Sequence, residues 1–202
     1  MLELTLNVKI YKEYNKIIKK RDGKNEKVLV LSSSPRKGGN SDILCDEFIL
    51  GAKESRNDVE KIFLKDKKIN YCVACEYCTK NNGICIQKDD MADILDKIVK
   101  ADVIVMATPV YFYTMNGQIK TLIDRTVARY TEIKNKEFYF IATAADNRKE
   151  ALERTIEGFR GLIDCLDGAV EKDIIYGIGA WKVGEIKNTN AMKEAYEMGK
   201  SL

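Results

Sequence analysis

The chain has 202 residues, 45% of them hydrophobic and 32% charged, a composition ordinary for one globular domain. Its net charge is only +3 and is scattered along the chain, so we expect neither nucleic acid nor a membrane surface as partner. No apolar run reaches the roughly 18 residues of a membrane span and no secretory signal precedes the domain, which predicts a cytoplasmic protein. Histidine is absent, which excludes Ser-His and Cys-His nucleophile pairs.

Residues 1–26 differ in pattern from the rest of the chain and form a predicted N-terminal extension. Leu2, Leu4 and Leu6 alternate as in a strand, and a helical period follows from residue 10 to residue 18. An arm that docks on a partner subunit and a mobile tail are both compatible with this pattern. Residues 27–202 form the predicted main domain.

From Lys27 onward, short apolar runs alternate with helical periodicity, which is typical of a parallel sheet covered on both faces. Five strands are predicted, at residues 28–31, 59–64, 103–107, 138–142 and 170–176. Helical repeats follow them at residues 44–52, 91–99, 119–127, 152–166 and 190–200. This alternation predicts an α/β fold with a three-layer, doubly wound sheet. Five strands favour the flavodoxin-like type with strand order 2-1-3-4-5 over its dinucleotide-binding relative.

The segment SSSPRKGGNS, residues 32–41, joins the first predicted strand to a helix. The positive end of a helix dipole lies at this junction. It is surrounded there by serine hydroxyls, the Asn40 amide, the Arg36 guanidinium and the N–H groups of a backbone made flexible by glycine. The nucleoside triphosphate loop and the dinucleotide fingerprint G-x-G-x-x-G are both missing. The segment therefore predicts an oxyanion site suited to a terminal monophosphate, and an ordinary turn with a polar helix cap is the alternative.

Four of the six cysteines lie in one loop after the second predicted strand, with the spacing C-x2-C-x2-C-x6-C. They are Cys72, Cys75, Cys78 and Cys85. The compact C-x2-C-x2-C run is typical of a cubane cluster, whereas structural zinc prefers two separated knuckles. A 4Fe-4S cluster is the prediction, and a zinc site or a thiol loop without metal are the alternatives. Cys45 and Cys165 have apolar neighbours at helical spacing and are predicted core residues.

Ligands of doubly wound sheets bind beyond the carboxyl ends of the strands, where the strand order reverses between the first and third strands. The loop after the third strand contains Pro109 and the consecutive aromatics Tyr111, Phe112 and Tyr113. Such planar side chains are suited to flank a flat heterocycle. The alternative is that they cover a sheet edge or a subunit interface.

Three stretches together resemble a known family. They are SSSPRKGGNS, the end of the cysteine loop CIQKDDM, and ADVIVMATPVYFYTMNGQIKTLIDRT at residues 101–126, with a weaker match in GIGAWKVGEI at residues 177–186. These segments are similar to the NAD(P)H-dependent FMN reductases of flavodoxin-like fold, and among them to the iron-sulfur flavoproteins. One departure is the pair Ala144 and Ala145, which stands where relatives often carry glycines.

The resemblance implies which residues bind FMN. The phosphate would be bound by Ser32, Ser34, Arg36, Asn40 and Ser41. The ribityl chain and isoalloxazine would be lined by Pro109, Val110, Tyr111, Phe112 and Tyr113, and Thr143 would close the ring pocket.

The expected function is that of an FMN-dependent oxidoreductase in which NAD(P)H stacks on the flavin and passes hydride to it. The cofactor supplies this chemistry, so no catalytic side chain is required. The electrons would pass to a small-molecule or protein acceptor, with the iron-sulfur cluster as an intermediate carrier. We also expect a homodimer or homotetramer. A non-enzymatic electron carrier and a thiol or metal sensor on an empty scaffold are the alternatives.

Overall fold

The five predicted strands all form, and they lie in the predicted order. The computed structural model describes residues 25–202, so the predicted extension of residues 1–26 lies outside the described residues except for its last two. The parallel strands are β1 (Lys27–Ser32), β2 (Asp58–Phe63), β3 (Val103–Tyr111), β5 (Glu137–Thr143) and β6 (Val170–Gly177). They pair in the order β2-β1-β3-β5-β6, which is the flavodoxin-like arrangement.

A sixth, very short strand was not predicted from the sequence. The strand β3 continues four residues beyond the predicted end at residue 107, passes Pro109, and reverses into β4 (Thr114–Met115). The pairing is antiparallel, with Val110 opposite Met115 and Tyr111 opposite Thr114. Two residues carry too little periodicity to be recognised as a strand.

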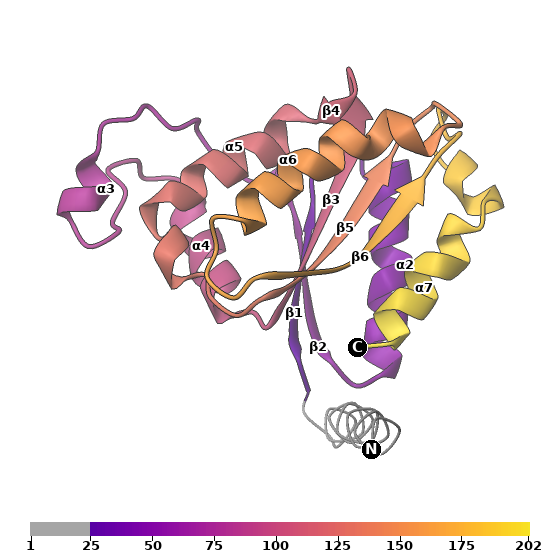
Figure 1. The fold of residues 1–202 in the computed structure, drawn as a ribbon, viewed down its shortest axis with the longest axis horizontal. Coiled ribbons are helices and arrows are strands. Elements are labelled where there is room, and N and C mark those ends of the chain that lie inside the picture. Colours follow the sequence, from indigo (N-terminus) through magenta and orange to yellow (C-terminus); the bar gives the residue numbers. More distant parts are fainter. Residues whose placement is uncertain (1–24) are drawn as a thin grey trace, which may run out of the picture.

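Helices cover both faces of the sheet (Figure 1). One layer contains α2 (Asn40–Glu54) and α7 (Ala191–Lys200), and the other contains α4 (Met91–Lys100), α5 (Gly117–Arg125) and α6 (Glu153–Ile163). The short helical segments are η1 (Leu64–Asp66), α3 (Tyr77–Lys80), η2 (Thr126–Ala128), η3 (Tyr130–Glu132), η4 (Lys149–Leu152) and η5 (Glu185–Asn188). No helix in residues 25–202 has the length and hydropathy needed to span a bilayer.

The alternation of side chains along β1 explains why two helical layers form. Val28 and Val30 pack in the same core as α2 and α7, whereas Leu29 and Leu31 pack with the opposite layer. Because successive residues of a strand point to opposite faces, a continuous apolar run needs cover on both sides. The carboxyl ends of the strands then meet at one edge of the sheet.

The two isolated cysteines differ in their surroundings. Cys45 lies wholly buried in α2, as predicted, and burial raises the pKa of its thiol to about 12. Cys165 is exposed, so its predicted place in the core is wrong. It lies just beyond the end of α6, where the flanking Ile163 and Leu166 take the buried positions.

Candidate functional site

A cavity of about 520 Å³ opens at the carboxyl ends of β1, β3 and β5. We call it the strand-end cavity. It is lined by Ser34, Pro35, Arg36, Asn40, Ser41, Pro109, Val110, Tyr111, Thr143, Ala144, Ala145, Ala180, Trp181, Lys182 and Val183. The volume lies within the range usual for small-molecule sites. The structure therefore gathers most of the predicted FMN-binding residues around one space, and Ser32, Phe112 and Tyr113 lie outside its lining.

The loop between β1 and α2 is held in one shape by local hydrogen bonds. The Ser34 hydroxyl accepts the Arg36 N–H at 3.2 Å and donates to the Arg36 carbonyl at 2.7 Å. Gly38 has a φ of +68°, a conformation that most side chains disfavour. A Cβ on Gly39 would lie 2.5 Å from the Ser34 hydroxyl oxygen, so the turn requires glycine there.

The first turn of α2 presents unpaired donors to the strand-end cavity. Helix geometry leaves the first N–H groups without intrahelical acceptors, and no side chain caps them. The hydroxyl of Ser41 is buried and has no hydrogen-bond partner in the structure. An unpaired buried polar group is destabilising by about 1–3 kcal/mol, and an oxyanion in the cavity would supply the acceptor. These donors fit a phosphate group.

Asn40 has a connecting role in addition to lining the cavity. Its amide nitrogen donates to the carbonyls of Ala180 and Lys182, both at 3.0 Å, and its oxygen accepts the Gly184 N–H at 3.0 Å. The loop of residues 180–184 is thereby fixed to the start of α2. This loop brings Trp181, 75% exposed, to the cavity wall.

Ser32 lies behind the loop rather than in the cavity. Its hydroxyl, fully buried, donates to a carboxylate oxygen of Asp42 at 2.7 Å. The other carboxylate oxygen of Asp42 accepts the Gly38 N–H at 2.9 Å, and Lys61 of β2 lies 2.7 Å from the carboxylate. Burial alone would raise the pKa of Asp42, but the bonds from Lys61, Ser32 and Gly38 hold it below its usual value. Asp42 and Lys61 were not among the predicted site residues.

A buried polar network joins the loops that follow β1 and β3. Asn116 donates its side-chain N–H to the Ser33 carbonyl, and its backbone N–H to the Thr108 hydroxyl at 3.1 Å. The oxygen of the Asn116 side chain caps α5 by accepting the Ile119 N–H at 3.3 Å. Neither Asn116 nor Ser33 was predicted, because a lone amide in a loop carries no distinguishing pattern.

The aromatic run forms the tip of the hairpin between β3 and β4. Tyr111 lines the strand-end cavity, whereas Phe112 is 100% exposed and Tyr113 is half exposed. Phe112 and Tyr113 have φ values of +50° and +62°. Left-handed backbone at residues other than glycine is destabilising by about 1–3 kcal/mol and often marks functional loops. The tip is therefore a strained, exposed aromatic feature beside the cavity.

The four predicted metal-binding cysteines are not gathered in the structure. The loop of residues 70–88 and α3 extend away from the sheet (Figure 1). Cys72 and Cys75 are exposed, and Cys78 and Cys85 are partly buried. Within residues 25–202, no three side chains of His, Cys, Asp or Glu lie close enough to hold a metal ion.

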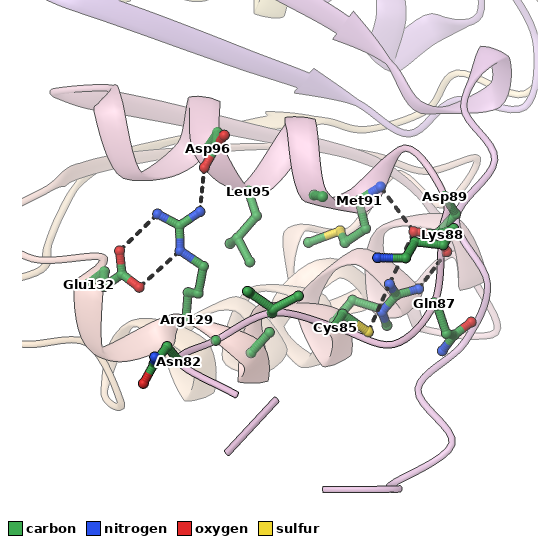
Figure 2. A pocket seen from close by; sticks show the side chains of 15 residues that line it. Asn82, Cys85, Gln87, Lys88, Asp89, Met91, Leu95, Asp96, Arg129 and Glu132 are labelled. Atoms are coloured by element: carbon green, nitrogen blue, oxygen red, sulfur yellow. Dashed lines mark hydrogen bonds and ion pairs between the residues drawn. The ribbon is translucent and has the colours of Figure 1, made fainter. Parts of the chain in front are cut away.

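Cys85 alone among these four lines a second cavity, of about 580 Å³, which we call the cysteine-loop cavity. Figure 2 shows Cys85 and Asp89 at one end of it, and Arg129 between Asp96 and Glu132 at the other. Arg125 and Arg129 of this lining are already paired with Asp89, Asp96 and Glu132. Most of the charge in this cavity is therefore already neutralised within the protein.

Arg125 fastens both ends of the cysteine loop to α5. This guanidinium, 2% exposed, forms a two-pronged pair with Asp89 at 2.7 and 3.1 Å and donates to the Asn70 carbonyl at 2.7 Å. It also donates to the Cys85 sulfur at 3.4 Å. Asp89 in turn accepts the N–H groups of Asn70 and Met91. Cys85 is thus held in place by the body of the protein.

Comparison with known proteins identifies relatives of this chain. The model of the NADPH-dependent FMN reductase family matches residues 26–166. An iron-sulfur flavoprotein of Methanosarcina thermophila is 31% identical over 87% of this chain and 93% of its own length. A second, from Methanocaldococcus jannaschii, is 36% identical over 65% of this chain and 68% of its own. A third, from Archaeoglobus fulgidus, is 37% identical over 49% of this chain, which spans 44% of that protein.

Solved structures share the fold. The Trp repressor binding protein from Bacillus subtilis superposes with a TM-score of 0.65 at 23% identity, over 85% of this chain and 96% of that one. An FMN-dependent NADH-azoreductase from Bacillus anthracis, solved in complex with FMN, gives a TM-score of 0.66 at 19% identity, over 86% of this chain and 97% of that one. At this identity the likeness concerns the fold alone.

Proposed function

The chain belongs to the NADPH-dependent FMN reductase family, and on this basis we propose that it is an NAD(P)H-dependent oxidoreductase holding FMN in the strand-end cavity. The observation that carries the proposal is the unpaired, buried Ser41 hydroxyl beside the uncapped start of α2. These donors face the same cavity as the predicted flavin-lining residues. A phosphate at this position would complete their hydrogen bonding.

The phosphate end of FMN would be bound by Arg36, Ser41 and the N–H groups of the first turn of α2, while Ser34, whose hydroxyl proton is donated to the Arg36 carbonyl, shapes the loop around it. The Arg36 guanidinium adds a charge-assisted bond from the rim. Asn40 acts differently in this proposal, because its amide is already bonded to residues 180–184 and holds them against the site.

The ring end of FMN would lie between the β3 loop and the loops after β5 and β6. Pro109, Val110 and Tyr111 form one wall, and Ala144 and Ala145 lie on another. Trp181 is positioned to exclude water from the open side. FMN held there would supply the capacity to accept hydride and to transfer electrons, so the part of these residues is to bind, orient and shield it.

We further propose that Cys72, Cys75, Cys78 and Cys85 ligate a 4Fe-4S cluster. The support is the compact spacing of the thiols and the name iron-sulfur flavoprotein carried by several relatives. The donor chemistry fits such a cluster, whereas the loop as described does not bring even three of the four sulfurs together. Cluster binding would therefore require the exposed part of the loop to close toward Cys85.

The electron acceptor would be a small molecule or a protein, and we expect a homodimer or homotetramer in the cytoplasm. An anaerobic visible spectrum before and after NADPH addition tests the oxidoreductase. Bleaching of bound flavin is the expected result. A stable oxidised flavin would favour a carrier that exchanges electrons with protein partners, and protein that binds no FMN would refute the proposal.

The cluster has its own test. Iron and sulfide are measured after anaerobic reconstitution of the native chain and of a Cys75→Ser variant. Stoichiometric uptake by the native chain and reduced uptake by the variant are expected. Equal uptake by both, or none by the native chain, would leave the loop as a thiol or structural feature of a plain FMN reductase.

A further inference from the structure

A buried ion pair lies directly behind the proposed phosphate loop. The carboxylate of Asp42 accepts the Ser32 hydroxyl at 2.7 Å and the Gly38 N–H at 2.9 Å. The Lys61 ammonium lies 2.7 Å from the same carboxylate. Asp42 and Ser32 are buried, Lys61 is partly buried, and none of the three lines the strand-end cavity.

The two bonds from the loop to Asp42 define the shape of the loop. Ser32 ends β1, and Gly38 has the left-handed backbone of the turn six residues later. A single carboxylate, with one oxygen for each donor, therefore holds both ends of this segment. Asp42 also follows Ser41 directly in the first turn of α2, so its position and that of the unpaired Ser41 hydroxyl are set together.

The carboxylate has an electrostatic disadvantage in this place. The positive end of the α2 dipole attracts anions, and a fixed negative charge there repels a phosphate that binds to the same helix end. Lys61, reaching across from β2, neutralises that charge. The arrangement keeps the two acceptor oxygens of Asp42 while removing its repulsion.

We propose that Asp42 is a positioning residue for the FMN phosphate, and that Lys61 makes this role compatible with an anionic ligand. The inference rests on the proposed FMN site and assigns a role to two residues that do not touch the cofactor. It predicts that substitutions of Asp42 or Lys61 weaken binding of the phosphate and leave binding of the ring unchanged, because neither residue faces the part of the cavity proposed for the flavin ring.

The test compares FMN with riboflavin, which has the same ring and lacks the phosphate. Dissociation constants of both are measured by quenching of flavin fluorescence on apo-protein. In Asp42→Asn one acceptor oxygen becomes a donor, so we expect FMN to bind about 10-fold more weakly or worse. Riboflavin affinity should change less than about threefold. Lys61→Met should show the same selective loss of FMN affinity. Lys61→Arg keeps the positive charge and should therefore retain most of the native FMN affinity.

Asp46→Asn is the matched control. Asp46 also pairs with Lys61, at 2.6 Å, one turn later on α2, but its side chain is 62% exposed and holds no loop atom. Its substitution removes the same charge and should leave both affinities within about twofold.

The results separate this inference from the proposed function. Native protein that binds FMN no more tightly than riboflavin would refute the phosphate site itself. If the native protein does prefer FMN to riboflavin, tighter or unchanged FMN binding in Asp42→Asn would show that the carboxylate only repels the phosphate and does not position its binding loop. Equal losses for FMN and riboflavin would indicate a general structural role and overturn the inference. If Asp42→Asn does not fold, Lys61→Met and Lys61→Arg decide the question.

Discussion

Replacing Ser41 by alanine is expected to change stability and affinity in opposite directions. The Ser41 hydroxyl is buried without a hydrogen-bond partner, so its removal relieves the apo-protein of an unsatisfied group. The free energy of unfolding should stay level or rise by up to about 1 kcal/mol. FMN binding should weaken, because a hydrogen bond to a charged group contributes about 1.5–3 kcal/mol, or roughly 10- to 150-fold in the dissociation constant.

Urea unfolding of apo-protein measures the first effect, and flavin fluorescence titration measures the second. Thr155 provides a matched control, because its hydroxyl is also buried and unpaired but lies in α6, outside the strand-end cavity. Thr155→Val should likewise leave apo stability level or higher, with FMN affinity unchanged. A Ser41→Ala protein that is less stable by more than about 1 kcal/mol and binds FMN normally would refute the reasoning.

Three further predictions concern the surroundings of the two cavities. Gly39→Ala should weaken FMN binding at least about 10-fold in a flavin titration, because its Cβ would displace the Ser34 hydroxyl 2.5 Å away; an unaffected affinity would contradict this. Arg125→Met should lower the free energy of unfolding in urea by about 3–5 kcal/mol, because it leaves the buried Asp89 carboxylate without its counter-charge, and a loss below about 1 kcal/mol would disprove the role of Arg125 in fastening the cysteine loop. The folded-state pKa of Asp42 lies below the usual 3.8, so its stabilisation is complete above that pH and is lost as the pH falls through the lower folded value. The stability difference between native protein and Asp42→Asn should accordingly narrow below about pH 4 in acid titrations followed by circular dichroism, and a constant difference would exclude this linkage.

Much of the fold was predictable because its signals are local in the chain. A strand buried on both faces must be apolar throughout, and the runs at residues 28–31 and 138–142 show this directly. The order of the strands followed from the strict alternation of strands and helices and from the number of strands, because five strands favour the flavodoxin-like type of doubly wound sheet. The same logic placed the loops after β1 and β3 at one edge, where the strand-end cavity is found.

What the sequence did not show about Cys165 and about the aromatic run has a common cause, which is that an element ends or turns at a place its periodicity does not indicate. Cys165 has apolar neighbours in sequence, yet α6 ends before it and leaves the thiol exposed. Phe112 and Tyr113 have left-handed backbone at the hairpin tip and stand outside the lining of the cavity that Tyr111 lines, a position that the aromatic run alone does not indicate. Periodicity describes a residue's position along an element and contains no information on where that element stops or bends.

The sequence by itself determined the sheet, its helical cover and the donor-rich loop at residues 32–41, because hydrophobic alternation and turn residues act within a few positions. Only the tertiary structure decided how that loop is held. The Asp42 to Lys61 pair spans β2 and α2, and Asn40 reaches a loop 140 residues away at Ala180. Tertiary structure also placed Cys85 against Arg125 without gathering three or more of the cysteines at residues 72–85 into one site. Such contacts arise when distant segments pack together, and packing geometry is a property of the whole fold rather than of any one segment.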